Sequence, residues 1–322
     1  ADGAAGQATF RQPHGLSVAP STGFAYVGET FASCIRSIEL STGAVRTIAG
    51  KCDTGGHRDT AFGEACAAAR FNHPHKVTVD PRNESIVYVS DVECSDDGLL
   101  YLKDTCKPTY GGVAFTGVRK LEMLSNGSCA RVSTIAGFFN ASAPTTNPIG
   151  FADGSTATAR FHYVHGVSIK PLAAGEKPSS GSSILYAIDD LNERVRKIDL
   201  AAGNVSTLAG TGRQGCKDGS GDIASFNAVG IAAGRDGSVY VADYENHKIR
   251  QLTMKSDDVV TAKTPPMGWN SWATFGCGVN ETILRNAADQ IHRLGLGKAG
   301  YQYVNTDDCW MNGARDPVTH AL

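Results

Sequence analysis

The sequence lacks the features that mark membrane, all-helical and nucleic-acid-binding proteins. No stretch approaches the ~20 uninterrupted apolar residues of a membrane-spanning helix, so we expect no membrane span. Lys and Arg number 30 against 32 Asp and Glu, and without a basic excess we expect no nucleic-acid partner. Only 19% of the 322 residues are charged while 37 are glycine, a balance that excludes an all-α fold and favours turn-rich β structure.

The chain also lacks any C-x-x-C pair of the zinc or thioredoxin type, although it has nine cysteines. This count indicates disulfides. Five Asn-x-Ser/Thr sequons agree with a secretory route, at Asn83, Asn126, Asn140, Asn204 and Asn280. We therefore expect an extracellular, lysosomal or vacuolar protein. Neither an initiator Met nor an apolar leader is present, and we expect the chain to begin inside a longer polypeptide.

One pattern recurs four times along residues 1–260. Each copy opens on a Phe, followed four residues later by His14, His75 or His165 in the first three copies and three residues later by Val229 in the weaker fourth copy. A Tyr-rich segment then ends in an acid: Glu29, Asp91, Asp189 and Asp243. An Arg follows this Tyr at a distance of 10 residues in three copies and of 31 in the second, which carries an insertion: Arg36, Arg119, Arg196 and Arg250.

Each copy predicts four short strands separated by turn residues, a sheet that cannot bury its faces alone. Blades packed around an axis solve that problem. The pattern resembles NHL-repeat β-propellers, most closely at residues 243–250. The resemblance implies a mainly β fold with four recognisable blades. Four is the low limit of the ~4 to 8 blades of propellers, so we expect further blades upstream.

The recurring side chains of the propeller have a structural and a functional interpretation. The three histidines share one register near the inner ends of the blades, a geometry that suits a metal, and the related peptide-amidating lyase carries its metal on central histidines. Because Val229 breaks the register, we favour hydrogen bonds to blade backbone and predict no metal and no cofactor. For the acids and arginines we predict salt bridges, either cross-strand or between blades, rather than catalysis. The insertion over residues 92–117 is either a binding loop or a surface excursion, and we predict a Cys94–Cys106 disulfide within it.

The composition changes after Thr261, and we place a second domain at residues 261–322. Apolar residues at Ile283, Ala287, Ile291 and Leu294 keep helical spacing, and Asn280 is a suitable N-cap. Strand signals precede and follow this helix. The segment therefore predicts a β-α-β unit.

Two motifs flank the predicted helix, at residues 266–272 and 300–311, and together they resemble the opening of the glycoside hydrolase family 27 α-galactosidases. The resemblance implies the start of an incomplete (β/α)8 barrel. It implies that Trp272 packs against the sugar, that Asp307 and Asp308 accept hydrogen bonds from galactose hydroxyls, and that Cys277 and Cys309 form a disulfide. In isolation, a core aromatic and a solvated turn would be the better interpretations of these residues; within the double motif we favour the sugar site.

A retaining glycosidase needs two carboxylates ~5 to 5.5 Å apart. The resemblance places both beyond the second strand, so we predict no catalytic residue within the 322 and an inactive chain. Its parent is expected to hydrolyse terminal α-galactosides, with an α-galactoside-containing carbohydrate as partner and the propeller face open to a protein partner. The alternative is a secreted propeller that binds proteins or glycans without activity. A third hypothesis, a metal-dependent propeller enzyme, requires a bound metal.

Overall fold

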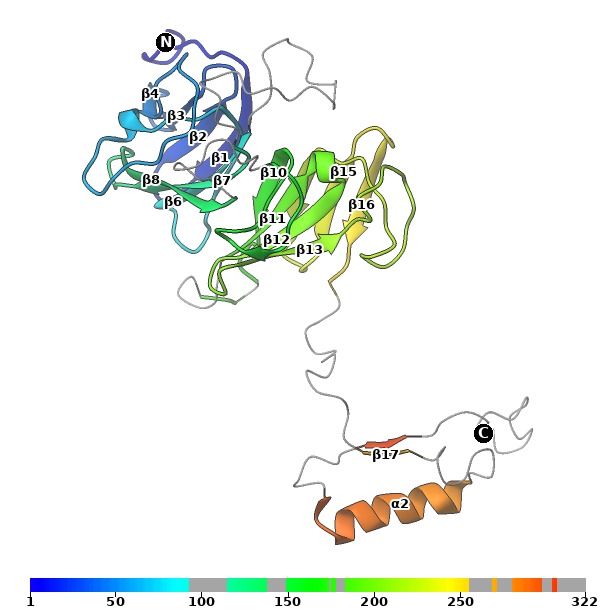
Figure 1. Ribbon diagram of the computed structural model, residues 1–322. Coiled ribbons are helices and arrows are strands. Elements are labelled where there is room, and N and C mark those ends of the chain that lie inside the picture. The colour runs from blue at the N-terminus through cyan, green and yellow to red at the C-terminus, as the bar shows by residue number, and fades with distance from the viewer. Residues whose placement is uncertain are drawn as a thin grey trace. The chain divides into compact units, whose positions relative to one another are not determined.

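The computed structural model describes residues 1–92, 115–137, 149–173, 175–177, 183–254, 268–270, 280–296 and 303–305. The chain divides into two compact units, Ala1–Met254 and Lys255–Leu322. The first unit is a set of β-sheets and the second contains a helix with two short strands (Figure 1). The fold is mainly β, as the sequence predicts.

The first two blades are antiparallel meanders of four strands in chain order. Blade 1 consists of β1 (Pro13–Ala19), β2 (Phe24–Glu29), β3 (Cys34–Glu39) and β4 (Val45–Ala49). Blade 2 consists of β5 (His73–Val79), β6 (Ile86–Val92), β7 (Gly117–Met123) and β8 (Cys129–Ala136). Both have the predicted number of strands. A 3-10 turn, η1 (Cys66–Ala68), precedes blade 2.

Blades 3 and 4 depart from four strands in opposite directions. Blade 3 consists of β10 (Val164–Ile169), β11 (Ile184–Asp189), β12 (Arg194–Asp199) and β13 (Asn204–Ala209), and β9 (Gly154–Ser155) adds a fifth strand on β13. The turn η2 (Asp190–Asn192) follows β11. Blade 4 has three strands among the described residues: β14 (Gly230–Ala233), β15 (Val239–Asp243) and β16 (Lys248–Leu252).

The core of this unit lies between the blades rather than within them. One hydrophobic cluster joins Tyr26 and Ile35 of blade 1 to Val77 and Val79 of blade 2. Similar clusters join blade 2 to blade 3 and blade 3 to blade 4. Because successive sheets pack face to face, the short strands gain the apolar burial that a lone sheet would lack.

Glycine in the innermost strands lets the blades approach closely. A Cβ on Gly15 of β1 would lie 2.5 Å from the backbone nitrogen of Val77 in β5. A Cβ on Gly166 of β10 would lie 3.0 Å from the carbonyl oxygen of Val229, next to β14. Any larger side chain would push the neighbouring blade away.

Two disulfides confirm that cysteine is used for cross-links. Cys34 pairs with Cys52, and Cys66 pairs with Cys129. Within the described residues Cys216 is a free, exposed thiol. The predicted Cys94–Cys106 and Cys277–Cys309 pairs lie outside the described residues.

The second unit contains β17 (Gly268–Asn270), α2 (Glu281–Arg293) and β18 (Tyr303–Asn305). The two strands pair in parallel, which gives the predicted β-α-β order. Asn280 caps the helix: its side-chain oxygen accepts a hydrogen bond from the Ile283 nitrogen at 3.0 Å. Among the helices of the described ranges, none has the length and apolarity to cross a bilayer.

Candidate functional site

The parallel pairing of β17 and β18 brings the carboxyl ends of both strands to one edge. Asn270 at the end of β17 lies opposite Asn305 at the end of β18. In sequence, Trp272 follows Asn270 by two residues, and Asp307 follows Asn305 by two. The predicted sugar-site residues Trp272, Asp307 and Asp308 themselves lie outside the described residues. The two strands leading to them have the order that a barrel start requires.

In the propeller, the recurring acids and arginines form one buried ion pair in each blade. The carboxylate ends one strand and the guanidinium reaches it from the next strand of the same sheet, so the pairs are cross-strand. The N–O distances are 2.5 Å for Arg36–Glu29, 3.0 Å for Arg119–Asp91, 2.6 Å for Arg196–Asp189 and 2.8 Å for Arg250–Asp243. The predicted salt bridges are therefore present in all four blades.

Each arginine also contacts a second acid and the Phe that opens its repeat. The second acid comes from the loop ahead of the blade: Asp2, Asp59, Asp153 and Asp218. The Phe ring centroids lie 4.8 to 5.2 Å from the guanidinium carbons. These landmarks, far apart in sequence, thus converge on one cation in each blade.

Sequence reasoning missed Asp59 as a member of this set. It lies 12 residues before its Phe, whereas Asp2 lies 8 residues before Phe10, and Thr60 replaces the glycine that follows the acid in the other copies. Only the shared contact with a buried arginine reveals the equivalence.

Burial has the largest effect on the pKa of two of these acids, Asp91 and Asp189. It raises the pKa of Asp91 to about 7 against the lowering effect of Arg119, and it raises the pKa of Asp189 to about 6 against that of Arg196. Both side chains are completely buried. A reacting group needs access to substrate, so these carboxylates serve the fold rather than catalysis.

The three recurring histidines come together, as their shared register suggests. The His75 ring centroid lies 4.2 Å from that of His14 and 4.4 Å from that of His165, both in edge-to-face contact. The His165 Nδ1 atom lies 3.4 Å from a carboxylate oxygen of Asp190. In the described contacts, ring packing therefore takes the place of the hydrogen bonds to blade backbone that we expected from sequence.

Burial disfavours the charged form of two rings in the histidine cluster, those of His14 and His75. Burial lowers the pKa of His75 well below its ordinary value, and the neighbouring His165 and His14 lower it further. Burial likewise lowers the pKa of His14. Among the described residues there is no group of three or more His, Cys, Asp or Glu side chains arranged to hold a metal ion.

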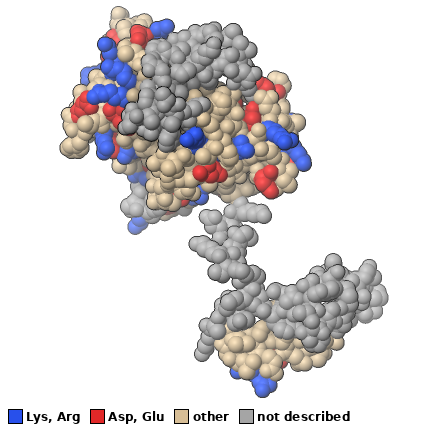
Figure 2. Space-filling view, viewed as in Figure 1, with Lys and Arg blue, Asp and Glu red and all other residues tan. Residues whose placement is uncertain are grey.

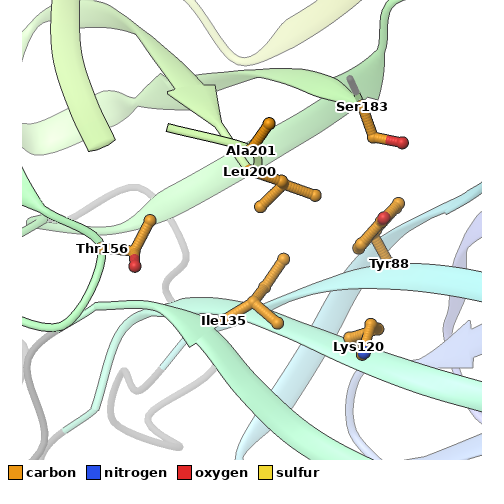
Figure 3. Close-up of a pocket in the computed structure, with 7 residues that line it drawn as sticks. All are labelled: Tyr88, Lys120, Ile135, Thr156, Ser183, Leu200 and Ala201. Atoms are coloured by element: carbon orange, nitrogen blue, oxygen red, sulfur yellow. The ribbon is translucent and has the colours of Figure 1, made fainter. Parts of the chain in front are cut away.

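A pocket of about 450 Å³ lies between blades 2 and 3 (Figure 3). It is lined by Tyr88, Lys120, Ile135, Thr156, Ser183, Leu200 and Ala201. The Tyr88 and Ser183 hydroxyls both donate to Asp80, and burial followed by the Asp80 charge raises the pKa of Tyr88. The lining offers hydroxyls, an amine and apolar surface.

On the face of the first unit shown in Figure 2, the described residues form no large patch of one charge sign. Lys and Arg alternate there with Asp and Glu.

Comparison with known proteins separates the two units. Residues 264–321 match the family model described as "Alpha galactosidase A". This segment is similar to α-galactosidases. It is 59% identical over 54 residues to an α-galactosidase of Oryza sativa, covering 17% of this chain and 13% of that protein. The chain is also 44% identical over 75 residues to an α-galactosidase of Cyamopsis tetragonoloba, covering 23% of this chain and 18% of that protein.

The α-galactosidase match is thus partial, since the chain spans less than a fifth of the length of these relatives. Residues 227–252 match the NHL-repeat model, which agrees with blade 4. A solved structure, an auxiliary nutrient binding protein from Bacteroides thetaiotaomicron, is similar over 76% of this chain and 69% of its own, with 16% identity and a TM-score of 0.39. That similarity is too low to bear on function.

Proposed function

We propose that this protein contributes to the hydrolysis of terminal α-galactosides, with residues 261–322 supplying the first part of a sugar site and the propeller, residues 1–260, acting as a binding or interaction module. The observation that carries the proposal is the parallel β17–β18 pair within the segment that matches α-galactosidases. Both strands run toward the motif residues Trp272, Asp307 and Asp308.

The residue types of this proposed site suit a sugar. A flat aromatic such as Trp272 packs on the apolar face of a pyranose ring. The carboxylates of Asp307 and Asp308 accept charge-assisted hydrogen bonds from hydroxyls. In (β/α)8 barrels the functional groups lie at the carboxyl ends of the strands, which is where these three residues fall in the sequence. A Cys277–Cys309 disulfide would tie the two strand ends together.

In this proposal the 322-residue chain recognises sugar without turning it over. Retaining hydrolysis needs a nucleophile and an acid/base about 5 to 5.5 Å apart. Asp307 and Asp308 hold the substrate, and neither performs the attack. Because the match covers less than a fifth of each α-galactosidase, the remaining barrel strands that position a bound sugar are also outside it.

We place the protein in the secretory pathway, either outside the cell or in a lysosome or vacuole. Two disulfides among the described residues support an oxidising compartment. The sequon asparagines that the structure describes are all exposed and accessible to glycosylation: Asn83, Asn126, Asn204 and Asn280. Digestion of secreted protein with a glycosidase that removes N-linked glycans should lower its mass.

An assay on an aryl α-galactoside tests the proposed activity. The 322-residue chain should release no aryl alcohol, whereas a longer form that completes the barrel should release it. In the longer form, Asp307→Ala or Asp308→Ala should weaken transition-state binding by about 1.5 to 3 kcal/mol, the contribution of a hydrogen bond to a charged group. Asp289→Ala, on the exposed side of α2, is the matched control and should leave the rate unchanged.

Two results would contradict the proposal. Turnover by the 322-residue chain would refute the missing-carboxylate argument. A folded but inactive longer form would favour the alternative function, a secreted propeller that binds proteins or glycans. Peptide mapping without reductant tests the disulfide separately: Cys277 and Cys309 should be recovered as one linked peptide, and recovery of both as free thiols from secreted protein would disprove the pairing.

A further inference from the structure

Each blade has two distinct packing faces that recur at fixed positions of the repeat. The forward face of a blade is formed by the Tyr that recurs in each repeat and by the residue before the recurring Arg. The rear face is formed by the second and fourth residues after the recurring His or, in blade 4, after Val229. In the first interface, Tyr26 and Ile35 of the forward face of blade 1 pack on Val77 and Val79 of the rear face of blade 2.

The same pairing of faces builds the other two interfaces. Tyr88 and Val118 share a cluster with Val167 and Ile169 between blades 2 and 3. Between blades 3 and 4 the equivalent residues are Tyr186, Val195, Ile231 and Ala233. In blades 1 to 3 every forward-face residue is buried. A forward face thus packs on the rear face of the next blade throughout the unit.

The forward face of blade 4 has the same residue types but is uncovered. Tyr240 is 37% exposed and Ile249 is 75% exposed. The glycine in the innermost strand of these blades shows the same difference. A Cβ on Gly15 or Gly166 would meet the following blade, whereas a Cβ on Gly230 would contact only Ala242 of its own blade. Blade 4 therefore presents a complete blade-packing face to solvent.

The rear face of blade 1 is uncovered in the complementary way. Leu16 is 54% exposed and Val18 is 44% exposed, although Val77, Val167 and Ile231 are buried at the position of Leu16. Phe10 is also exposed, unlike the Phe that opens each other repeat. The two ends of the blade series are thus one forward face and one rear face, the two halves of an interface that the molecule makes three times internally.

We propose that these two faces join copies of the chain head to tail, with the forward face of blade 4 of one copy on the rear face of blade 1 of a second copy. The contact continues the interface already established between successive blades, with the same residue types at the same repeat positions. A head-to-tail contact is heterologous, so it forms a ring if the rotation closes. Two copies with four blades each give eight blades, within the ~4 to 8 of closed propellers, and bury both apolar faces.

Sedimentation velocity of the full 322-residue chain over a wide concentration range tests this proposal. We expect a species of twice the 33.8 kDa chain mass. Ile249→Asp on the forward face, or Leu16→Asp on the rear face, should return the mass to that of one chain. Both side chains are largely exposed, so neither change should unfold the protein, and far-UV circular dichroism verifies this. Phe62→Asp is the matched control: Phe62 is 96% exposed and belongs to neither face, so the dimer should persist.

Mixing the two monomeric variants distinguishes head-to-tail from other arrangements. The Leu16→Asp chain keeps an intact forward face and the Ile249→Asp chain keeps an intact rear face, so the mixture regains one undamaged interface and should form heterodimers. Three results would overturn the proposal: a wild-type chain that stays monomeric at every concentration, a dimer that survives either substitution, and a mixture that shows no heterodimer. The first would leave both faces to blades from another polypeptide segment.

Discussion

The buried arginine of each blade is the feature whose removal should cost most, and Arg196→Met in blade 3 is the sharpest case. The Arg196 guanidinium is fully buried and pairs with Asp189 at 2.6 Å and with Asp153 at 2.7 Å. It also donates to the carbonyl oxygens of Arg160 and Ala152 at 3.1 and 2.8 Å. Methionine fills similar space but makes none of these bonds.

The expected loss of stability comes from the buried carboxylate that Arg196→Met leaves without its cation. Asp189 has no exposure and would keep its backbone bond from His162 while losing its cation. Breaking a buried pair by removing one partner costs about 3 to 5 kcal/mol. For a unit of this size, that corresponds to a fall of roughly 6 to 20 °C in melting temperature. Arg11→Met removes an exposed pair with Asp53 and should cost about 0 to 1 kcal/mol.

The measurement is thermal unfolding followed by far-UV circular dichroism, which reports the β-sheets. Tryptophan fluorescence is unsuitable because Trp269, Trp272 and Trp310 all belong to the other unit. A double variant, Arg196→Met with Asp189→Asn, should be less destabilised than the sum of the two single variants, because it leaves no unpaired charge. Equal melting temperatures for Arg196→Met and Arg11→Met, or strict additivity in the double variant, would refute the reasoning.

Three further perturbations have signs that the structure determines. By the loop-closure model, replacing Cys66 and Cys129 by Ala should cost about 4 kcal/mol of stability, whereas replacing Cys34 and Cys52, which close a shorter loop, should cost about 3 kcal/mol. Chemical denaturation of the two double variants measures both costs. Burial and then Arg119 lower the pKa of His57 to about 2. The contribution of His57 to stability should therefore be complete above its unfolded-state pKa near 6.5, and the free energy of unfolding should fall by up to about 1.4 kcal/mol per pH unit below that value. His57→Gln should flatten this pH dependence, and an unchanged profile would contradict the assignment. Gly15→Ala should destabilise the protein by about 1 to 3 kcal/mol. The cost should exceed that of Gly166→Ala, because a Cβ at position 15 would lie closer to neighbouring backbone than one at position 166. Melting temperatures that rank the two variants the other way would contradict the close approach of the strands.

Repetition made most of the propeller predictable from the sequence. The constant distance from Tyr26 to Arg36, from Tyr186 to Arg196 and onward fixes which residues face each other across adjacent strands, so the ion pairs follow from spacing alone. The helix α2 was equally predictable, since Asn280 caps it where the sequence indicates and it ends at Arg293, two residues before Gly295.

What the sequence left open depends on contacts between segments whose spacing varies. The partner of Cys66 is 63 residues away, and no local pattern selects Cys129 over the other cysteines. The spacing from Asp59 to Phe71 is 12 residues, against 8 between the acid and the Phe in the other copies, and this difference hid Asp59. The histidine register was visible, but its outcome was not: whether His75 would bond to backbone or pack on other rings depends on how closely the inner strands approach.

Both described disulfides join cysteines that precede blade 3 in the chain, and this has a consequence for biosynthesis. Cys34 and Cys52 both belong to the first copy, whereas Cys66 lies in the turn η1 just before blade 2 and Cys129 lies in β8 of that blade. At a synthesis rate of about 5 to 20 residues per second, the 63 residues between the second pair emerge within about 3 to 13 seconds of Cys66. In an oxidising compartment, the nascent chain can therefore lock each of its first two blades before the ribosome has delivered the next one, and neither bridge needs the C-terminal segment to be present.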